Sequence, residues 1–110
     1  MDQDRQASMA GVMNRLWVQF LPLMVERVAI LEAVAAALAE GTLTPDRRVE
    51  ASGEAHKLAG VLGTFGLSEG TLLAREAEMG LGGEPETGPS AARLAEIGAQ
   101  LRTMLADRKP

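Results

Sequence analysis

The sequence predicts an all-α fold, an antiparallel four-helix bundle with an additional N-terminal helix. Of the 110 residues, 46% are hydrophobic and only 3% are aromatic, which suits packed helices better than sheets, because sheets favour β-branched and aromatic residues. Apolar residues recur every three or four positions, the period of a helix with one buried face. Mostly short connections make neighbouring helices antiparallel. We expect one helical domain over residues 1–110, either complete or a module of a larger protein.

The first two expected helices meet at a proline. Because proline lacks an amide hydrogen and crowds the preceding turn, we expect Pro22 to open a second helix over residues 22–39 instead of kinking a longer one. Gly41 is placed to supply a left-handed stop after it. The helix before Pro22 is expected over residues 6–21, and its apolar face consists of Met9, Val12, Met13, Leu16, Trp17 and Phe20.

The remaining three helices carry their own start signals. Thr44 can cap free amides ahead of Pro45 in a first turn, which predicts a helix from there to about Phe65. Ser68 is a candidate cap for a helix over residues 69–79. Residues 80–89 hold four glycines and two prolines, so we expect an irregular loop there and a last helix from Pro89 or Ser90 to about Arg108.

Charge and composition exclude several classes of function. With 15 acidic and 11 basic residues the net charge is −4, and no basic stripe is visible, which argues against a general nucleic-acid binder. The absence of cysteine excludes disulfides, thiolate zinc sites and cysteine nucleophiles. Three charged residues interrupt the most apolar stretch, residues 23–39, so we expect no membrane span. The N-terminus does not resemble a secretory signal, and we expect a cytoplasmic protein.

The only histidine, His56, is predicted to point away from the core. By helical geometry it lies roughly 140° from the centre of the stripe that must face inward, and that stripe consists of Ala51, Ala55, Leu58, Leu62 and Phe65. Gly53 and Gly60 share the outer face, although each glycine costs about 0.5–1 kcal/mol relative to alanine in a helix. We infer that they give another protein access to the ring; the alternative is that they allow a neighbouring helix to pack tightly.

The surroundings of His56 in the sequence narrow its chemistry. A neutral imidazole is a competent nucleophile near neutral pH, because its ordinary pKa is about 6.5. No carboxylate stands four residues before or after it and there is no second histidine, which disfavours a hydrolytic dyad and a histidine metal site. Lys57 is adjacent and would lend positive charge to a phosphoryl group, unless it is merely a solvated surface lysine.

Two runs, AHKLAGVLGTFGL over residues 55–67 and LLAREAE over residues 72–78, resemble the signature of histidine phosphotransfer (HPt) domains. The stretch over residues 16–32 is also similar to the family, so the resemblance covers nearly the whole chain. It implies a four-helix bundle with an accessory N-terminal helix, whose histidine carries phosphate between aspartates of response-regulator receiver domains. On this basis His56 is the phosphoryl acceptor and donor, and Gly60 is the small residue that clears the ring.

The resemblance also implies roles for two residues near His56, and this chain departs from the family pattern at one position. Lys57 matches a basic residue found beside the histidine in many members. The family often has a second lysine where this chain has Ala59. Glu78 stands where the family commonly has a polar residue, often glutamine, that faces the histidine. A carboxylate there would either hydrogen-bond the ring or repel phosphate.

These observations lead to one expected function and two alternatives. We expect a monomeric phosphorelay carrier, not an enzyme, whose partners are receiver domains and also a histidine kinase. It would need no cofactor of its own, since Mg²⁺ is expected in the receiver. The first alternative is a receiver-docking module without phosphotransfer, in which Ala59 reflects lost chemistry. The second is a helical dimerisation domain that associates through Trp17, Phe20 and Leu21.

Overall fold

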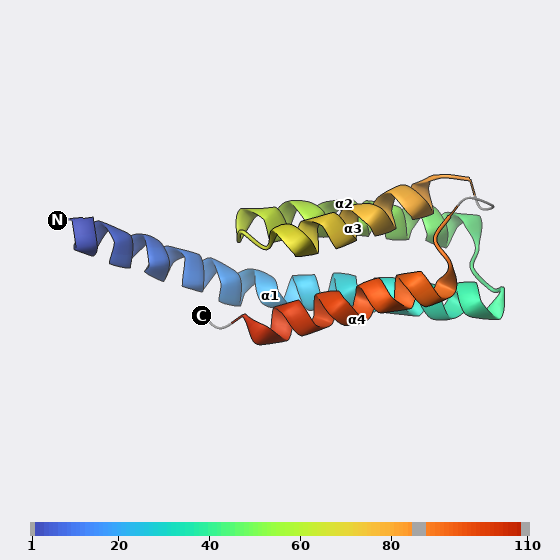
Figure 1. The fold of residues 1–110 in the computed structure, drawn as a ribbon, viewed down its shortest axis with the longest axis horizontal. Helices are drawn as coiled ribbons and strands as arrows, with labels where there is room; N and C mark the ends of the chain where they lie inside the picture. The colour runs from blue at the N-terminus through green and yellow to red at the C-terminus, as the bar shows by residue number, and fades with distance from the viewer. Residues whose placement is uncertain (1, 85–87, 109–110) are drawn as a thin grey trace.

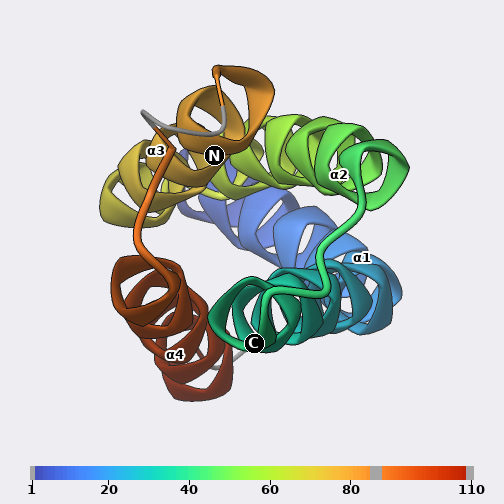
Figure 2. The same cartoon turned by 90° about the vertical axis from the view of Figure 1, so that its right-hand side faces the viewer.

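A computed structural model describes residues 2–84 and 88–108. That part of the chain forms four helices and no strand, and the helices are α1 (Asp2–Glu40), α2 (Pro45–Thr64), α3 (Ser68–Gly82) and α4 (Ala91–Asp107). Helices α2 and α3 lie side by side over the pair formed by α1 and α4, and consecutive helices run in opposite directions (Figures 1 and 2). The N-terminal part of α1 projects beyond the other three helices (Figure 1). The expected all-α bundle is therefore confirmed.

The expected break at Pro22 is wrong. Helix α1 is continuous over 39 residues with Pro22 inside it, so the additional N-terminal helix is an extension of the first bundle helix. Trp17 before the proline and Met24 and Val28 after it are fully buried in the same core. Burying each such side chain contributes about 1.5–3 kcal/mol, which together exceeds the cost of about 3 kcal/mol for an interior proline.

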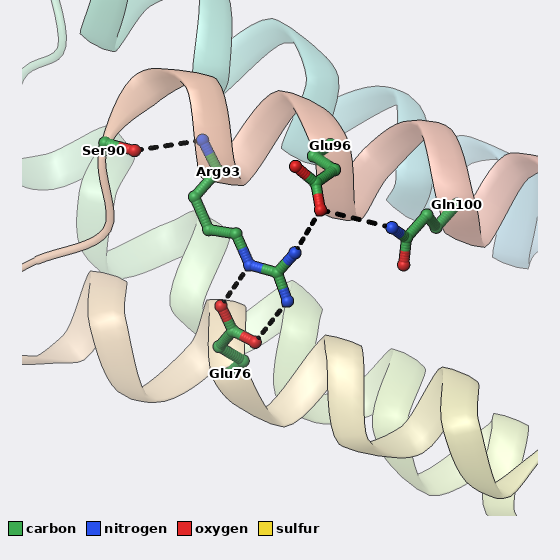
Figure 3. A network of polar contacts seen from close by, with 5 residues as sticks. All are labelled: Glu76, Ser90, Arg93, Glu96 and Gln100. Atoms are coloured by element: carbon green, nitrogen blue, oxygen red, sulfur yellow. Dashed lines mark hydrogen bonds and ion pairs between the residues drawn. The ribbon is translucent and has the colours of Figure 1, made fainter.

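The helix ends follow most of the expected capping signals. The Thr44 side chain accepts a hydrogen bond from the Arg47 amide at 3.2 Å, and Ser90 does the same for Arg93 at 3.1 Å (Figure 3). Gly41 adopts the left-handed conformation after α1, with φ +73°. Ser68 is not a cap, however, because Leu67 precedes α3 without a side-chain cap bond and Ser68 is already helical.

Helix α3 continues three residues beyond the expected end at Met79. Leu81 is only 1% exposed and belongs to the core, so its burial extends the helix through Gly80 and Gly82. The Arg48 guanidinium also donates a hydrogen bond to the Gly80 carbonyl at 2.9 Å. The irregular loop is therefore shorter than expected, and residues 85–87 of it lie outside the described residues.

Aromatic residues close the end of the bundle from which α1 extends. Trp17 is fully buried and meets the Phe65 ring edge-on, with ring centroids 5.2 Å apart. The Arg108 guanidinium lies 4.4 Å from the centre of the Trp17 ring, while Phe20 and Leu21 are partly buried against the core. Trp17 therefore cannot serve as an association surface, which contradicts that element of the dimerisation alternative. None of the described helices has the length and apolar character needed to cross a membrane.

Candidate functional site

Helix α2 places His56 on the outside of the bundle. The Ala55 and Leu58 side chains on either side of it in sequence are fully buried, whereas the His56 side chain is 73% exposed. Since residues three and four apart share a helix face, burial of the apolar stripe forces the imidazole outward. The predicted direction of the only histidine is thus confirmed.

The two glycines on this face are exposed and have room around them. A Cβ atom added at Gly53 or at Gly60 would meet nothing within 4 Å. Helix packing on small residues brings a neighbouring backbone close, and no such neighbour is present here. The interpretation that these glycines let another helix pack tightly is therefore wrong.

Glu78 from α3 contacts the imidazole. Its Oε2 lies 2.8 Å from His56 Nδ1, and its side chain is half-buried. An ionised carboxylate only accepts hydrogen bonds, so the nitrogen that faces it carries the hydrogen. In the neutral ring this leaves the lone pair on Nε2. In that tautomer the contact holds the ring in place and leaves Nε2 as the nitrogen with a lone pair that can react.

Two cross-helix hydrogen bonds hold α2 and α3 in register on either side of this contact. Ser52 Oγ donates to the Glu78 carbonyl at 2.9 Å, and Thr71 Oγ1 donates to the Ala59 carbonyl at 3.0 Å. Each bond gives a side-chain hydroxyl a partner on the facing helix, and His56 lies between the two bonds along the axis of α2. The position of Glu78 relative to the ring is therefore set by backbone contacts as well as by its own side chain.

An open pocket of about 330 Å³ lies beside the ring, lined by His56, Ala59, Gly60, Arg75, Glu78 and Met79. Its volume is at the low end of the range of about 300–1,000 Å³ for small-molecule sites. Its position next to the exposed imidazole suits a small group carried on the ring.

The structure brings together only some of the residues singled out from the sequence. Gly60 and Glu78 line the pocket with His56, whereas Lys57 and Gly53 do not. The Lys57 ammonium lies 3.7 Å from Glu54 Oε1 on its own helix. The cation that lines the pocket is Arg75, which the sequence reasoning missed. Its spacing of three residues before Glu78 places it on the same face of α3 and is the signal that would have found it.

Comparison with known proteins gives two matches. The model of a protein family described as "Hpt domain" matches residues 15–109. Protein RcaC from Microchaete diplosiphon is 35% identical over 91 residues, which cover 83% of this chain but 14% of RcaC. The chain therefore spans a small part of the length of this curated relative. No solved structure gives a significant match.

Proposed function

Since the chain belongs to the Hpt domain family, whose members are histidine phosphotransfer modules of two-component phosphorelays, we propose that His56 is the residue that carries the phosphoryl group. The observation that carries this proposal is the 73% exposure of the chain's only imidazole. A group exchanged between two proteins must be reachable by both of them. A nucleophile on the outer face of a rigid helix meets that requirement.

The geometry supports attack by His56 Nε2. In the proposed step this nitrogen forms a bond to the phosphorus of an aspartyl phosphate on a receiver domain. The bond between that phosphorus and the aspartate oxygen breaks, and the aspartate leaves as a carboxylate. The Nδ1 hydrogen remains bonded to Glu78, which stabilises the positive charge that develops on the ring. The reverse step returns the phosphoryl group to a second aspartate.

Gly60 and Gly53 are proposed to keep the approach to the ring open. Gly60 lines the pocket one turn after His56, and Gly53 lies three residues before it, with open space at both positions. A receiver must bring its phosphoaspartate into contact with Nε2, so a side chain at Gly60 would stand in its path. Lys57 is proposed to assist only weakly, since Glu54 already neutralises part of its charge.

We propose that the partners are receiver domains and a histidine kinase, and that the chain acts as a monomer in the cytoplasm. Hpt domains are carriers and not kinases, and we propose that this chain has no kinase activity of its own. It would need no resident cofactor, because the Mg²⁺ that neutralises an acyl phosphate belongs to the receiver pocket.

The test uses a receiver domain carrying radiolabelled phosphate on its aspartate, mixed with the purified chain. We expect label on the chain that is lost in acid and retained in alkali, as a phosphoramidate requires. The matched variant is His56→Gln, checked for unchanged helicity by circular dichroism, and it should acquire no label. Absence of label on the wild-type chain despite binding of the receiver would instead indicate the docking module. Label that persists in His56→Gln would also overturn the proposal.

A further inference from the structure

We propose that Arg75 is the cation that binds the phosphoryl oxygens once His56 is phosphorylated; this inference rests on the proposed function. Arg75 lies on α3 and lines the same pocket as the imidazole. The guanidinium presents several N–H donors in a planar fork that matches a phosphate group.

The Arg75 side chain is available for a new partner. Across the residues that the structure describes, it makes no hydrogen bond or ion pair. Other cations of the chain are already engaged with carboxylates, namely Arg27 with Glu54, Arg93 with Glu76 and Glu96, and Arg102 with Glu32. An exposed arginine beside a pocket, with no carboxylate of its own, is suited to an anion that arrives later.

Apart from the imidazole itself, no other basic side chain lines the pocket. The pocket includes Ala59, whose methyl group provides no cation. Lys57 points along α2 to Glu54, 3.7 Å away. The basic residue that can neutralise the phosphoryl group is therefore Arg75, which lines the pocket from α3.

Glu78 makes such a cation necessary. A phosphoryl group carries about −1.5 to −2 charges near pH 7, and the Glu78 carboxylate contacts the same ring at Nδ1. The two negative charges repel each other across the imidazole. Arg75 precedes Glu78 by three residues on one face of α3, so it can offset both. The arrangement lets the carboxylate orient the ring without driving off the phosphoryl group.

The test measures the pKa of the phosphoryl group on the intact chain. A phosphoramidate salt phosphorylates the chain without a partner protein: the His56 Nε2–P bond forms, the P–N bond of the salt breaks, and its protonated nitrogen leaves as ammonia, while the Nδ1 hydrogen stays on the ring. Phosphorus NMR then follows the phosphohistidine signal against pH. A nearby cation favours the dianion, so we expect Arg75→Ala to raise the phosphoryl pKa by about 0.5–1 unit, given solvent screening.

Three further variants make the result specific. Arg75→Lys keeps the charge but not the fork, and should give an intermediate pKa. Arg47→Ala removes an exposed arginine outside the pocket and should leave the wild-type value, and Lys57→Ala should move it less than Arg75→Ala. An Arg75→Ala pKa equal to wild type, or a larger shift in Lys57→Ala, would overturn the inference.

The same spectra separate this inference from the proposed function. If no phosphohistidine signal forms on the wild-type chain, or if the same phosphorus signal appears in His56→Gln and therefore comes from another residue, the proposed function itself fails. If the signal forms on His56 but the phosphoryl pKa of the Arg75 variants equals that of the wild type, the carrier function stands and the proposed role of Arg75 is wrong.

Discussion

His56 Nδ1 and Glu78 Oε2 are 2.8 Å apart, although the two residues are 22 positions apart in the sequence. The contact joins α2 to α3 and does not involve Nε2, on a side chain that is 73% exposed. An imidazole free to exchange its hydrogen between two nitrogens presents the correct lone pair only part of the time. Glu78 removes that ambiguity, and most of the expected behaviour of the site depends on this contact.

Removing the Glu78 side chain should therefore slow phosphotransfer. Glu78→Ala loses the hydrogen bond that fixes the ring; at a partly exposed site such a bond contributes about 1–1.5 kcal/mol, or roughly 5- to 10-fold in rate. Glu78→Gln keeps an acceptor for the Nδ1 hydrogen and should lose less. The measurement is the initial rate of label transfer from a phosphorylated receiver. A wild-type rate in Glu78→Ala would show that the contact has no part in the reaction.

Gly60→Leu should raise the stability of the fold but slow phosphotransfer. Because a Cβ at this position meets nothing within 4 Å, the substitution improves helix propensity and should stabilise the fold by about 0.5–1 kcal/mol. Its side chain would obstruct the receiver, so transfer should fall at least 10-fold. Gly53→Leu, outside the pocket, should have the same effect on stability and a smaller effect on transfer. Thermal unfolding measures the stability of the two variants, and transfer assays measure their activity. Unimpaired transfer in Gly60→Leu would show that Gly60 does not keep the approach to His56 open.

Trp17→Ala should destabilise the fold without changing the oligomeric state. The indole is fully buried against Phe65, and truncation of such an aromatic residue costs about 3–5 kcal/mol. Val18→Ala is the matched control, because Val18 is 60% exposed and its loss should cost below about 0.5 kcal/mol. Urea denaturation gives the free energies of unfolding, and sedimentation gives the mass. A stable Trp17→Ala that converts a dimer to a monomer would restore the dimerisation alternative.

Stability should decrease in acid through two ion pairs that tie α4 to its neighbours. Hydrogen bonds from Arg102 lower the pKa of Glu32, and those from Arg93 lower the pKa of Glu76 (Figure 3). A carboxyl whose pKa is lower when folded stabilises the fold above its unfolded pKa, and the contribution disappears as pH falls through the folded value. The difference in unfolding free energy between wild type and Glu76→Gln should therefore shrink from pH 7 to pH 3. A difference independent of pH would contradict this assignment.

The spacing of apolar residues predicted which face of each helix is buried. The spacing of Ala55, Leu58 and Leu62 set the inner face of α2 and therefore the direction of His56. The expected helix start at Pro22 is wrong because core residues on both sides of the proline keep α1 continuous there. The expected end of α3 is too early because the glycines around Leu81 indicate a loop, whereas burial of that leucine extends the helix to Gly82.

The candidate site was only partly predictable for a related reason. The histidine and its glycines share one helix, so helical periodicity relates them directly. The partners from α3 depend on the register between two helices, which Ser52 and Thr71 set through bonds to backbone carbonyls. The family resemblance pointed to Glu78 from the sequence, whereas Arg75 is identified only by the structure, in which it lines the pocket beside His56.

The decisive experiment on the role of His56 identifies which of its ring nitrogens becomes phosphorylated. The chain is labelled with ¹⁵N in its single histidine, phosphorylated with a phosphoramidate salt, and examined by ¹⁵N and ³¹P NMR. We expect one phosphorus coupled to Nε2 of His56, with a hydrogen retained on Nδ1 next to Glu78. Phosphorus coupled to Nδ1, or no phosphorus on the ring at all, would contradict this expectation.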